Sequence, residues 1–407
     1  MNCLILGAGP NQLELIKKAN LRGFFTIVVT PYDSDPGVSI AGAYIKADIK
    51  NISEILRQSA QFRPSMCITD QSDVGALSQA HICAALSIPC MSIETAESFC
   101  NKYKCYATIL AAGKQFHPDT IYFEKVEPAA DYLAEKSSER SSLLVKPINS
   151  QGSKGVSRLG SIDDVQLLTQ ALDESDGAGF VIQQYVEGRH FSIDAVIAPG
   201  HYSTLVVAEK TKYLGNPNLD KRLVLTSENH DAVPKSLVDF HREVVYTLGL
   251  PRGLTHGEYV LSEDGAIFLI EVAARGGGGN ISAKVIKYVT GFDPLDFIID
   301  SGVDSVSEIL VDSNSQRCAI LHFFDIDTEI DESLGALNIS NLLHFEYRKP
   351  IIKMGTPKDS RLRPGYFIVG GQTLAEARAN ELAILAQLGL RLIDQNSPSD
   401  SRNDTYV

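Results

Sequence analysis

Two glutamates and one arginine are spaced so that they could bind a metal ion and a phosphate group together. Glu258 begins one apolar run and Glu271 ends the next, and residues 262–265 (Ser-Glu-Asp-Gly) form the turn between them. An antiparallel hairpin closed by this turn brings both carboxylates to one end of the strand pair. Paired carboxylates hold Mg²⁺ when substrate phosphates complete its shell, whereas buried carboxylates without a cation are costly. Arg275, followed by four glycines, could neutralise a transferring phosphoryl group.

A second candidate is a lysine that precedes a loop of small residues. Lys146 lies near the end of the apolar run 143–147, and the Gly- and Ser-rich segment 150–156 follows it. A buried lysine needs a compensating anion, and small residues let backbone N–H groups approach a phosphate closely. Taken alone, the segment is equally compatible with a hairpin that carries an exposed lysine.

The third candidate is segment 181–190, which has the pattern of a strand, a turn and a second strand. Backbone at such a crossing could hydrogen-bond the edge of an adenine, and a polar side chain beyond the turn could reach a ribose. The competing interpretation is an ordinary strand connection in which His190 is structural.

A weaker motif lies at the N-terminus, where Gly7-Ala8-Gly9 joins a strand to a helix. A dinucleotide fingerprint requires a third glycine, but Gln12 stands at that position. Asp33 lies beyond the second strand and could hold a ribose, so a nicotinamide oxidoreductase stays open as a distant alternative. The favoured interpretation is a tight turn below the start of a helix.

The order of apolar runs predicts the elements that must position these residues. Buried strands at 2–6, 24–29, 65–69 and 88–91 alternate with helices near 11–22, 51–61 and 73–86, which is typical of a parallel sheet covered by helices. Beyond residue 100, the predicted strands are 143–147, 155–159, 180–186, 255–261, 266–272, 317–324, 342–348 and 366–369. β-Branched and polar residues also alternate through 190–210. The predicted helices there are 101–112, 162–173, 234–248, 280–290 and 375–388.

Composition narrows the class of protein. The 407 residues allow two or three domains, and a net charge of −13 argues against a nucleic-acid surface. The first residues lack the charged start and the longer apolar core of a signal peptide, so none is expected there, and no apolar run approaches the length of a membrane span. The seven cysteines include no C-x-x-C pair, which predicts reduced thiols. We therefore expect a cytoplasmic protein that binds neither nucleic acid nor membrane.

The candidate motifs occur in the order found in the ATP-grasp superfamily, which the chain resembles over roughly residues 1–300 and most strongly over 142–292. The resemblance is closest to the branch of carboxylate–amine ligases and biotin carboxylase. It implies an α/β fold, α+β in the lid and the C-terminal part. The implied domains are an N-terminal α/β domain at 1–95, an ATP-grasp domain at 96–300 with a lid at about 115–187, and a C-terminal domain at 301–395 that completes the active site. Residues 396–407 are expected to be a disordered tail.

The resemblance also implies which residues bind ATP. Lys102 looks like the lysine that contacts the phosphates from the helix before the lid, with Lys104 as the alternative. Lys146 looks like the lid lysine on the α-phosphate. The other residues expected to bind ATP are Ser150, Gly152, Ser153, Gly155, Gln183, Gln184, Val186 and His190.

The same resemblance implies the metal site and the reacting groups. Glu258 and Glu271 look like ligands of Mg²⁺, with Mn²⁺ as a possible substitute. Arg275 resembles the arginine that steadies an acyl phosphate and the departing γ-phosphoryl group. Lys210 is expected to contact the acid substrate or the γ-phosphate.

Two departures from the family pattern bear on the substrate. Ala273 stands where an asparagine often provides a third metal ligand, and Gly279 stands where biotin carboxylase has a glutamate that serves bicarbonate chemistry. The predicted function is therefore an ATP-dependent ligase that activates a carboxylate as an acyl phosphate and joins it to an amine, with an amino-acid-type substrate. A bicarbonate-dependent carboxylase and a non-catalytic ATP-binding sensor remain the alternatives.

The expected partners are a small-molecule carboxylate and an amine. Arg348, Arg361 and Arg363 in the C-terminal region are candidates to hold a substrate carboxylate through paired hydrogen bonds. Solvated surface arginines are an equally good interpretation. A homodimer is compatible with the resemblance.

Overall fold

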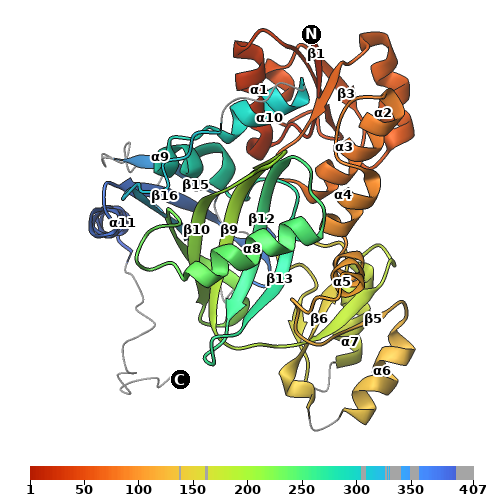
Figure 1. Cartoon of the computed structure of the whole chain (residues 1–407), viewed down its shortest axis with the longest axis vertical. Helices are drawn as coiled ribbons and strands as arrows, with labels where there is room; N and C mark the ends of the chain where they lie inside the picture. Colours follow the sequence, from red (N-terminus) through yellow and green to blue (C-terminus); the bar gives the residue numbers. More distant parts are fainter. Residues whose placement is uncertain are drawn as a thin grey trace.

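The computed structural model describes residues 1–136, 139–160, 164–303, 309–325, 328, 330, 341–348 and 357–390. Three sheets organise this part of the chain (Figure 1). The N-terminal sheet lies at one end, a small antiparallel sheet lies at the other, and a large sheet lies between them. The predicted tail at 396–407 lies outside the described residues.

The N-terminal sheet is parallel, as the alternation of strands and helices predicts. Its order is β3-β2-β1-β4, from β1 (Asn2–Leu6), β2 (Phe25–Thr30), β3 (Ala43–Lys46) and β4 (Met66–Ile68). Helix α1 (Pro10–Leu21) packs on one face together with α10 (Pro294–Gly302), which comes from much later in the chain. Helices α2 (Ile52–Ser59) and α3 (Asp73–Leu86) cover the other face. The strands are buried on both sides, which explains their continuous apolar sequences.

The predicted strand at 88–91 is wrong. These residues form an irregular connection between α3 and α4 (Ile93–Cys100). Ser87 ends α3 in a left-handed conformation with φ 55°, and Pro89 lacks the N–H that a strand pairing requires. The strand missing from the prediction is β3. It was not predicted because its apolar residues Ala43 and Ile45 alternate with Tyr44 and Lys46 and form no continuous apolar run.

The small sheet is antiparallel and has the order β5-β8-β6-β7. Its strands are β5 (Thr120–Phe123), β6 (Leu143–Pro147), β7 (Ser157–Arg158) and β8 (Phe180–Gln184). Helices α6 (Val126–Glu135) and α7 (Asp164–Asp173) bury the apolar side chains of one face. Lys146 therefore points to the opposite face, since side chains alternate along β6.

The large sheet has the order β13-β12-β9-β10-β11-β14-β16-β15, and all its neighbouring strands are antiparallel. Its strands are β9 (Arg189–Ala198), β10 (His201–Tyr213), β11 (Asn216–Thr226), β12 (Gly253–Leu261), β13 (Ile267–Ala273), β14 (Cys318–Phe323), β15 (Leu342–Tyr347) and β16 (Gly365–Gly371). The last three come from the C-terminal region, so that region extends this sheet.

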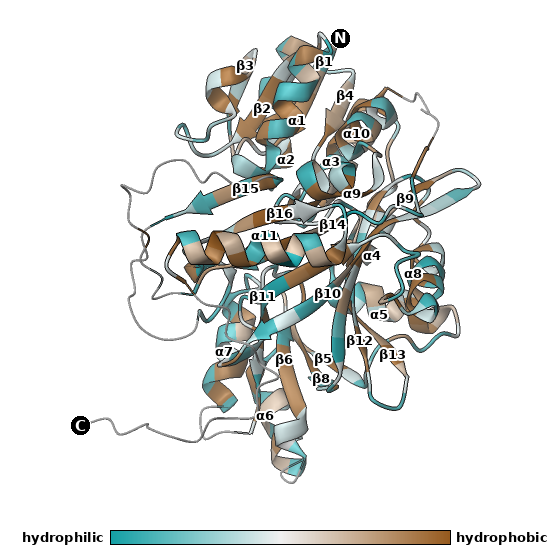
Figure 2. Ribbon diagram, turned by 90° about the vertical axis from the view of Figure 1, so that its left-hand side faces the viewer, coloured by the Kyte–Doolittle hydropathy of each residue, from teal (hydrophilic) through white to brown (hydrophobic). Residues whose placement is uncertain are grey.

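Helices cover both faces of the large sheet. Helix α8 (Lys235–Thr247) packs on one face near α5 (Lys102–Ala111), whereas a π turn at Ile281–Val285 and α9 (Ile286–Thr290) pack on the other. Helix α11 (Leu374–Gln387) lies across β14 and β16 (Figure 2). No helix among the described residues has the length and apolar character that a membrane crossing requires.

Candidate active site

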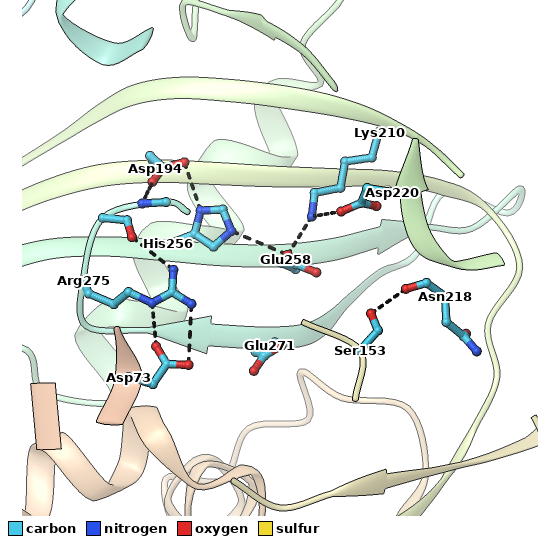
Figure 3. A network of polar contacts seen from close by, with 12 residues as sticks. Asp73, Ser153, Asp194, Lys210, Asn218, Asp220, His256, Glu258, Glu271 and Arg275 are labelled. Atoms are coloured by element: carbon cyan, nitrogen blue, oxygen red, sulfur yellow. Dashed lines mark hydrogen bonds and ion pairs between the residues drawn. The ribbon is translucent and has the colours of Figure 1, made fainter. Parts of the chain in front are cut away.

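The two glutamates lie directly opposite each other. Glu258 on β12 pairs in register with Glu271 on β13, and the register shifts immediately afterwards, between Glu258 and Tyr259. Directly opposed residues of antiparallel strands place their side chains on the same face of the sheet. Figure 3 shows the two side chains on their neighbouring strands. Both line a cavity of about 570 Å³, which we call the large cavity. Two carboxylates held so close together need a positive charge between or beside them.

Two lysines supply part of that charge. Lys210 donates to Glu258 Oε1 at 2.6 Å and to Asp220 Oδ2 at 3.0 Å, and its side chain is buried. Lys102 donates to Glu271 Oε1 at 3.1 Å and to the backbone oxygen of Ser150 at 3.0 Å. Burial alone would raise the pKa of Glu258, but Lys210 and the neighbouring histidine hold that pKa well below its usual range. The Glu258 carboxylate is therefore charged at neutral pH, as a metal ligand would have to be.

The donor set suits a magnesium ion that also binds phosphates. In the described part of the chain, no group of three or more His, Cys, Asp or Glu side chains is arranged to hold a metal ion by itself. Two carboxylates on one face of a hairpin are what Mg²⁺ uses when most of its remaining ligands are water and phosphate oxygens. The residues present thus fit a metal–nucleotide complex better than an isolated ion.

Arg275 is held by a residue that was not predicted from the sequence. Its Nε donates to Asp73 Oδ1 at 2.6 Å and its Nη2 to Asp73 Oδ2 at 3.5 Å, while Nη1 donates to the backbone oxygen of Gly276 at 3.0 Å. Asp73 is the first residue of α3, directly beyond β4 in the N-terminal sheet. The guanidinium lines the large cavity beside Glu271. The orientation of the Arg275 side chain therefore depends on a contact between the loop after β13 and helix α3.

The segment before α3 also fixes the residues that follow Arg275. Ser282 donates to Asp70 Oδ2 at 2.7 Å, and the backbone N–H of Asn280 donates to Gln71 Oε1 at 3.2 Å. Burial raises the pKa of Asp70 to about 6. A signal existed in the sequence: polar side chains at the carboxyl end of a buried parallel strand commonly serve a site.

A buried aspartate and histidine lie next to Glu258, and they too were not predicted. His256 Nδ1 lies 3.0 Å from Asp194 Oδ2, and His256 Nε2 lies 3.6 Å from Glu258 Oε1. Asp194 Oδ1 accepts a hydrogen bond from the backbone N–H of Gly277 at 2.7 Å. Burial by itself would lower the pKa of His256, but the Asp194 carboxylate raises it to about 9. The contacts form a continuous chain from the glycine run to the glutamate (Figure 3).

A smaller cavity of about 80 Å³ lies between the small sheet and the large sheet, and we call it the small cavity. Lys146 donates to Gln183 Oε1 at 2.8 Å in its wall. Burial and the nearby charge of Lys102 lower the pKa of Lys146 to about 8. Burial likewise lowers the pKa of His190 to about 4, so its ring is neutral. The residues expected to bind ATP that line this cavity are Lys102, Lys146, Ser150, Ser153, Gln183, Gln184, Val186 and His190.

The glycines and Ser153 of the loop, which were also expected to contact ATP, differ in the cavity that they line. Gly152 lines the large cavity and Ser153 lines both cavities. Gly155 lines neither; its φ is +67° and a Cβ at this position would lie 2.8 Å from Pro147, so the bend of the loop favours glycine here. Lys104 pairs with Glu97 at 2.6 Å away from both cavities, so Lys102, not its alternative, faces the site.

The Gly- and Ser-rich loop contacts the large sheet and the C-terminal region. Ser153 donates to the backbone oxygen of Asn218 at 2.7 Å, and the backbone N–H of Ser360 donates to the oxygen of Gly152 at 3.2 Å. Gly152 and Ser153 both have positive φ, at 67° and 61°. The loop thereby closes one side of the large cavity.

The three C-terminal arginines all line the large cavity. Arg348 pairs with Glu346 at 2.7 Å, and Arg361 pairs with Asp359 at 2.8 Å and with Glu174. Arg363 instead donates to the backbone oxygen of Asp220 at 2.5 Å and lies over the ring of Phe323 at 3.7 Å. Burial lowers the pKa of Arg363 because it disfavours the charged guanidinium. An anionic ligand beside Arg363 would favour the charged form again.

The N-terminal glycines belong to a packed turn. Gln12, at the position of the missing third glycine, approaches Gly7 and donates to the backbone oxygen of Asp70 at 2.8 Å. Asp33 is exposed and pairs with Lys46 and with the hydroxyl of Tyr44. These contacts favour the tight-turn interpretation over a nicotinamide site.

Comparisons with known proteins agree with this geometry. Residues 140–284 match the family model described as an ATP-grasp domain. The alanine–anticapsin ligases of Bacillus subtilis and Bacillus amyloliquefaciens are 22% identical over 278 residues, covering 63% of this chain and 57% of each relative. The match thus spans little more than half the length of these curated relatives.

Two solved structures share the fold. The L-amino acid ligase from Bacillus licheniformis superposes with a TM-score of 0.73 at 19% identity, covering 93% of this chain and 95% of that one. The carboxyaminoimidazole ribonucleotide synthase from Aspergillus clavatus, complexed with ATP, has a TM-score of 0.72 at 17% identity, covering 95% and 98%.

Proposed function

We propose that this chain, which contains an ATP-grasp domain at residues 140–284, is an ATP-dependent ligase that activates a carboxylate as an acyl phosphate and joins it to an amine. The observation that carries the proposal is the pairing of Glu258 with Glu271 in register, at a cavity that Arg275 also lines. A protein that only bound ATP would not need this metal pair. The resemblance to amino acid ligases supports an amino-acid-type substrate.

The nucleotide would bind where the two cavities meet. The adenine would lie in the small cavity against the backbone of Gln184 and Val186, with His190 near the ribose. The phosphates would extend towards Lys102 and Lys146 and under the Gly- and Ser-rich loop. Segment 115–187 would then act as the lid of the proposed domain 96–300, because it carries that loop and the small sheet.

The protein's contribution to phosphoryl transfer is alignment and charge neutralisation. Bound Mg²⁺, or Mn²⁺, on Glu258 and Glu271 would offset the charge of the phosphates as a Lewis acid. Arg275 and Lys210 would stabilise the charge that develops as the γ-phosphoryl group moves to the substrate carboxylate. Closure of the loop at Gly152 and Ser153 would exclude water and so protect the acyl phosphate from hydrolysis.

The large cavity would hold the acid and the amine. Arg348 and Arg361 are each paired with a carboxylate of the protein. Arg363 instead donates to a backbone oxygen and packs on an aromatic ring, so it is the best placed of these three arginines to bind a substrate carboxylate. Gly279 lines the same cavity at the position where biotin carboxylase has a glutamate, which argues against bicarbonate as the acid that is activated and favours an organic carboxylate. The C-terminal region 301–395 would thus complete the site begun by the N-terminal residues 1–95.

Release of ADP and phosphate, measured with a panel of amino acids and small acids, tests the proposal. Turnover that requires an acid together with an amine, with a condensed product in the mass spectrum, is the expected result. Bicarbonate dependence would instead identify a carboxylase, and tight ATP binding without turnover would identify a sensor.

We also propose a cytoplasmic location, because all seven cysteines are free thiols and five of them are buried. The homodimer remains a prediction, which light scattering on the purified protein would check.

A further inference from the structure

Glu258 is the end of a chain of contacts that starts in the glycine run after Arg275. The backbone N–H of Gly277 donates to Asp194 Oδ1 at 2.7 Å, and Asp194 Oδ2 lies 3.0 Å from His256 Nδ1. His256 Nε2 lies 3.6 Å from Glu258 Oε1. Asp194 lies on β9 and His256 on β12, where the two residues are direct register partners. Strand pairing therefore fixes the aspartate against the histidine.

The glycine at position 277 is needed for this contact. A Cβ at Gly277 would lie 2.7 Å from Asp194 Oδ1 and 3.1 Å from His256 Nδ1. Any side chain would push the aspartate away from the backbone N–H that it accepts from. The glycine run thus does more than clear space for substrate, because one of its members lets a buried carboxylate reach the main chain.

The contacts determine which atom of each group faces the metal site. A carboxylate only accepts hydrogen bonds, so the contact with Asp194 places a hydrogen on His256 Nδ1 and directs Nε2 at Glu258. Both contacts of Glu258, from Lys210 and from His256, are made to Oε1. The two contacts therefore hold the carboxylate through the same oxygen atom.

From this geometry we propose that Asp194 and His256 are positioning residues that hold the Glu258 carboxylate in place for a divalent cation and connect it to the glycine run. The inference rests on the proposed function, since it assigns the ion to Glu258. Groups that orient a metal ligand from behind commonly change metal affinity by about 10- to 100-fold when they are removed. We expect the same scale here.

Two substitutions of one residue separate positioning from packing. His256→Asn keeps an amide near the place of Nδ1 and can still donate to Asp194, but it cannot approach Glu258. His256→Gln places its amide near the position of Nε2 and can approach Glu258. Asp194→Asn removes the carboxylate that orients the ring. His322→Gln is the control, because His322 is also a buried histidine bound to a carboxylate, Glu381, on the same sheet.

The test is calorimetric titration of each full-length variant with ADP, with and without Mg²⁺, together with its melting temperature. The proposal expects the gain in ADP affinity caused by Mg²⁺ to fall about 10-fold or more in His256→Asn and Asp194→Asn. His256→Gln should retain more of that gain than His256→Asn, and ADP affinity without Mg²⁺ should change little in any variant. The control should keep the full gain even if it melts earlier.

Other outcomes overturn the inference. If Mg²⁺ raises the ADP affinity of His256→Asn as much as that of the wild type, Asp194 and His256 only pack the sheet. Equal losses of ADP affinity with and without Mg²⁺ would show the same. If the wild-type protein itself binds ADP no better with Mg²⁺, the proposed metal–nucleotide function fails instead, so the two failures are distinguishable.

Discussion

Arg275 donates its Nε hydrogen to Asp73 at 2.6 Å, although 202 residues separate the two in the sequence. The arginine belongs to the loop after β13, and the aspartate begins a helix of the N-terminal sheet. The Arg275 guanidinium, which lines the large cavity, is therefore oriented by the N-terminal part of the chain. If Arg275 acts in phosphoryl transfer as proposed, this contact would give the N-terminal part a role in the chemistry although it carries no complete nucleotide motif.

Substitution of Asp73 should impair turnover more than nucleotide binding. Asp73→Asn keeps the volume but loses the charged, two-point contact, so Arg275 would no longer be held for the transferring group. We expect kcat to fall about 10- to 100-fold, on the scale of other orienting contacts, while the Kd for ADP stays within about 2-fold. Asp131→Asn, at an exposed position in α6, is the control. An unchanged kcat would mean that Arg275 is held without Asp73.

Removal of one glutamate charge should abolish turnover while the fold stays intact. Glu271→Gln keeps the hairpin but removes half of the paired carboxylates, so we expect turnover to fall by at least about 100-fold and the melting temperature to change little. Glu263→Gln in the exposed turn of the same hairpin should behave as wild type. Full activity of Glu271→Gln would refute the metal assignment.

Loss of the Lys146 side chain should raise the ATP requirement. Hydrogen bonds to charged groups contribute about 1.5–3 kcal/mol, so Lys146→Ala should raise the apparent KM for ATP about 10- to 100-fold. Steady-state kinetics over a wide ATP range would measure this. A KM equal to that of the wild type would remove Lys146 from the nucleotide pocket.

Nucleotide binding near pH 8 should be accompanied by proton uptake. The pKa of Lys146 is lowered to about 8 in the free protein, so the side chain loses its proton as the pH rises through that value. Phosphates nearby favour the charged form and raise the pKa again. Calorimetry at pH 8 in buffers of different ionisation enthalpy should therefore detect uptake, which disappears at pH 6 and in Lys146→Ala. The same binding enthalpy in every buffer at pH 8 would contradict this assignment.

The packing of helix α11 on the large sheet should be stabilised by one buried ion pair. Arg222 on β11 donates twice to Glu381 on α11, at 2.7 and 2.6 Å, and His322 lies 2.8 Å from the same carboxylate. Breaking a buried pair by removing one partner costs about 3–5 kcal/mol. Glu381→Gln should lower the free energy of unfolding on that scale, with ADP affinity unchanged because Arg222 faces away from the large cavity.

The same pair predicts a pH dependence. Burial opposes ionisation, but His322 and Arg222 lower the pKa of Glu381 below its usual 4.5. The folded-state pKa is depressed, so the stabilisation is fully present above pH 4.5 and is lost as the pH falls through the folded-state value. Denaturant melts of wild type and Glu381→Gln should thus differ most at neutral pH and converge in acid. A difference that is independent of pH would contradict an ionised Glu381.

Local sequence was sufficient for the features whose partners are close along the chain. Glu258 and Glu271 are joined by a short hairpin, so their spacing and the turn residues already predicted that they would meet. The parallel N-terminal sheet was likewise predictable, because its strands and helices alternate with strong apolar runs. The strand at 88–91 was wrong because one apolar run with a proline does not distinguish a strand from a connection.

Only the tertiary structure decided which distant side chains complete the site. Asp194 and His256 lie in segments whose sequence gives no sign that they approach Glu258, and the position of Asp73 after a buried parallel strand does not indicate that its partner is Arg275. They meet because strand pairing places β9 beside β12 and because packing brings α3 against the loop after β13. Only the structure likewise shows that β14, β15 and β16 belong to the same sheet as β9 and β12. Such contacts depend on the register and packing of whole elements, which residue spacing along one segment does not encode.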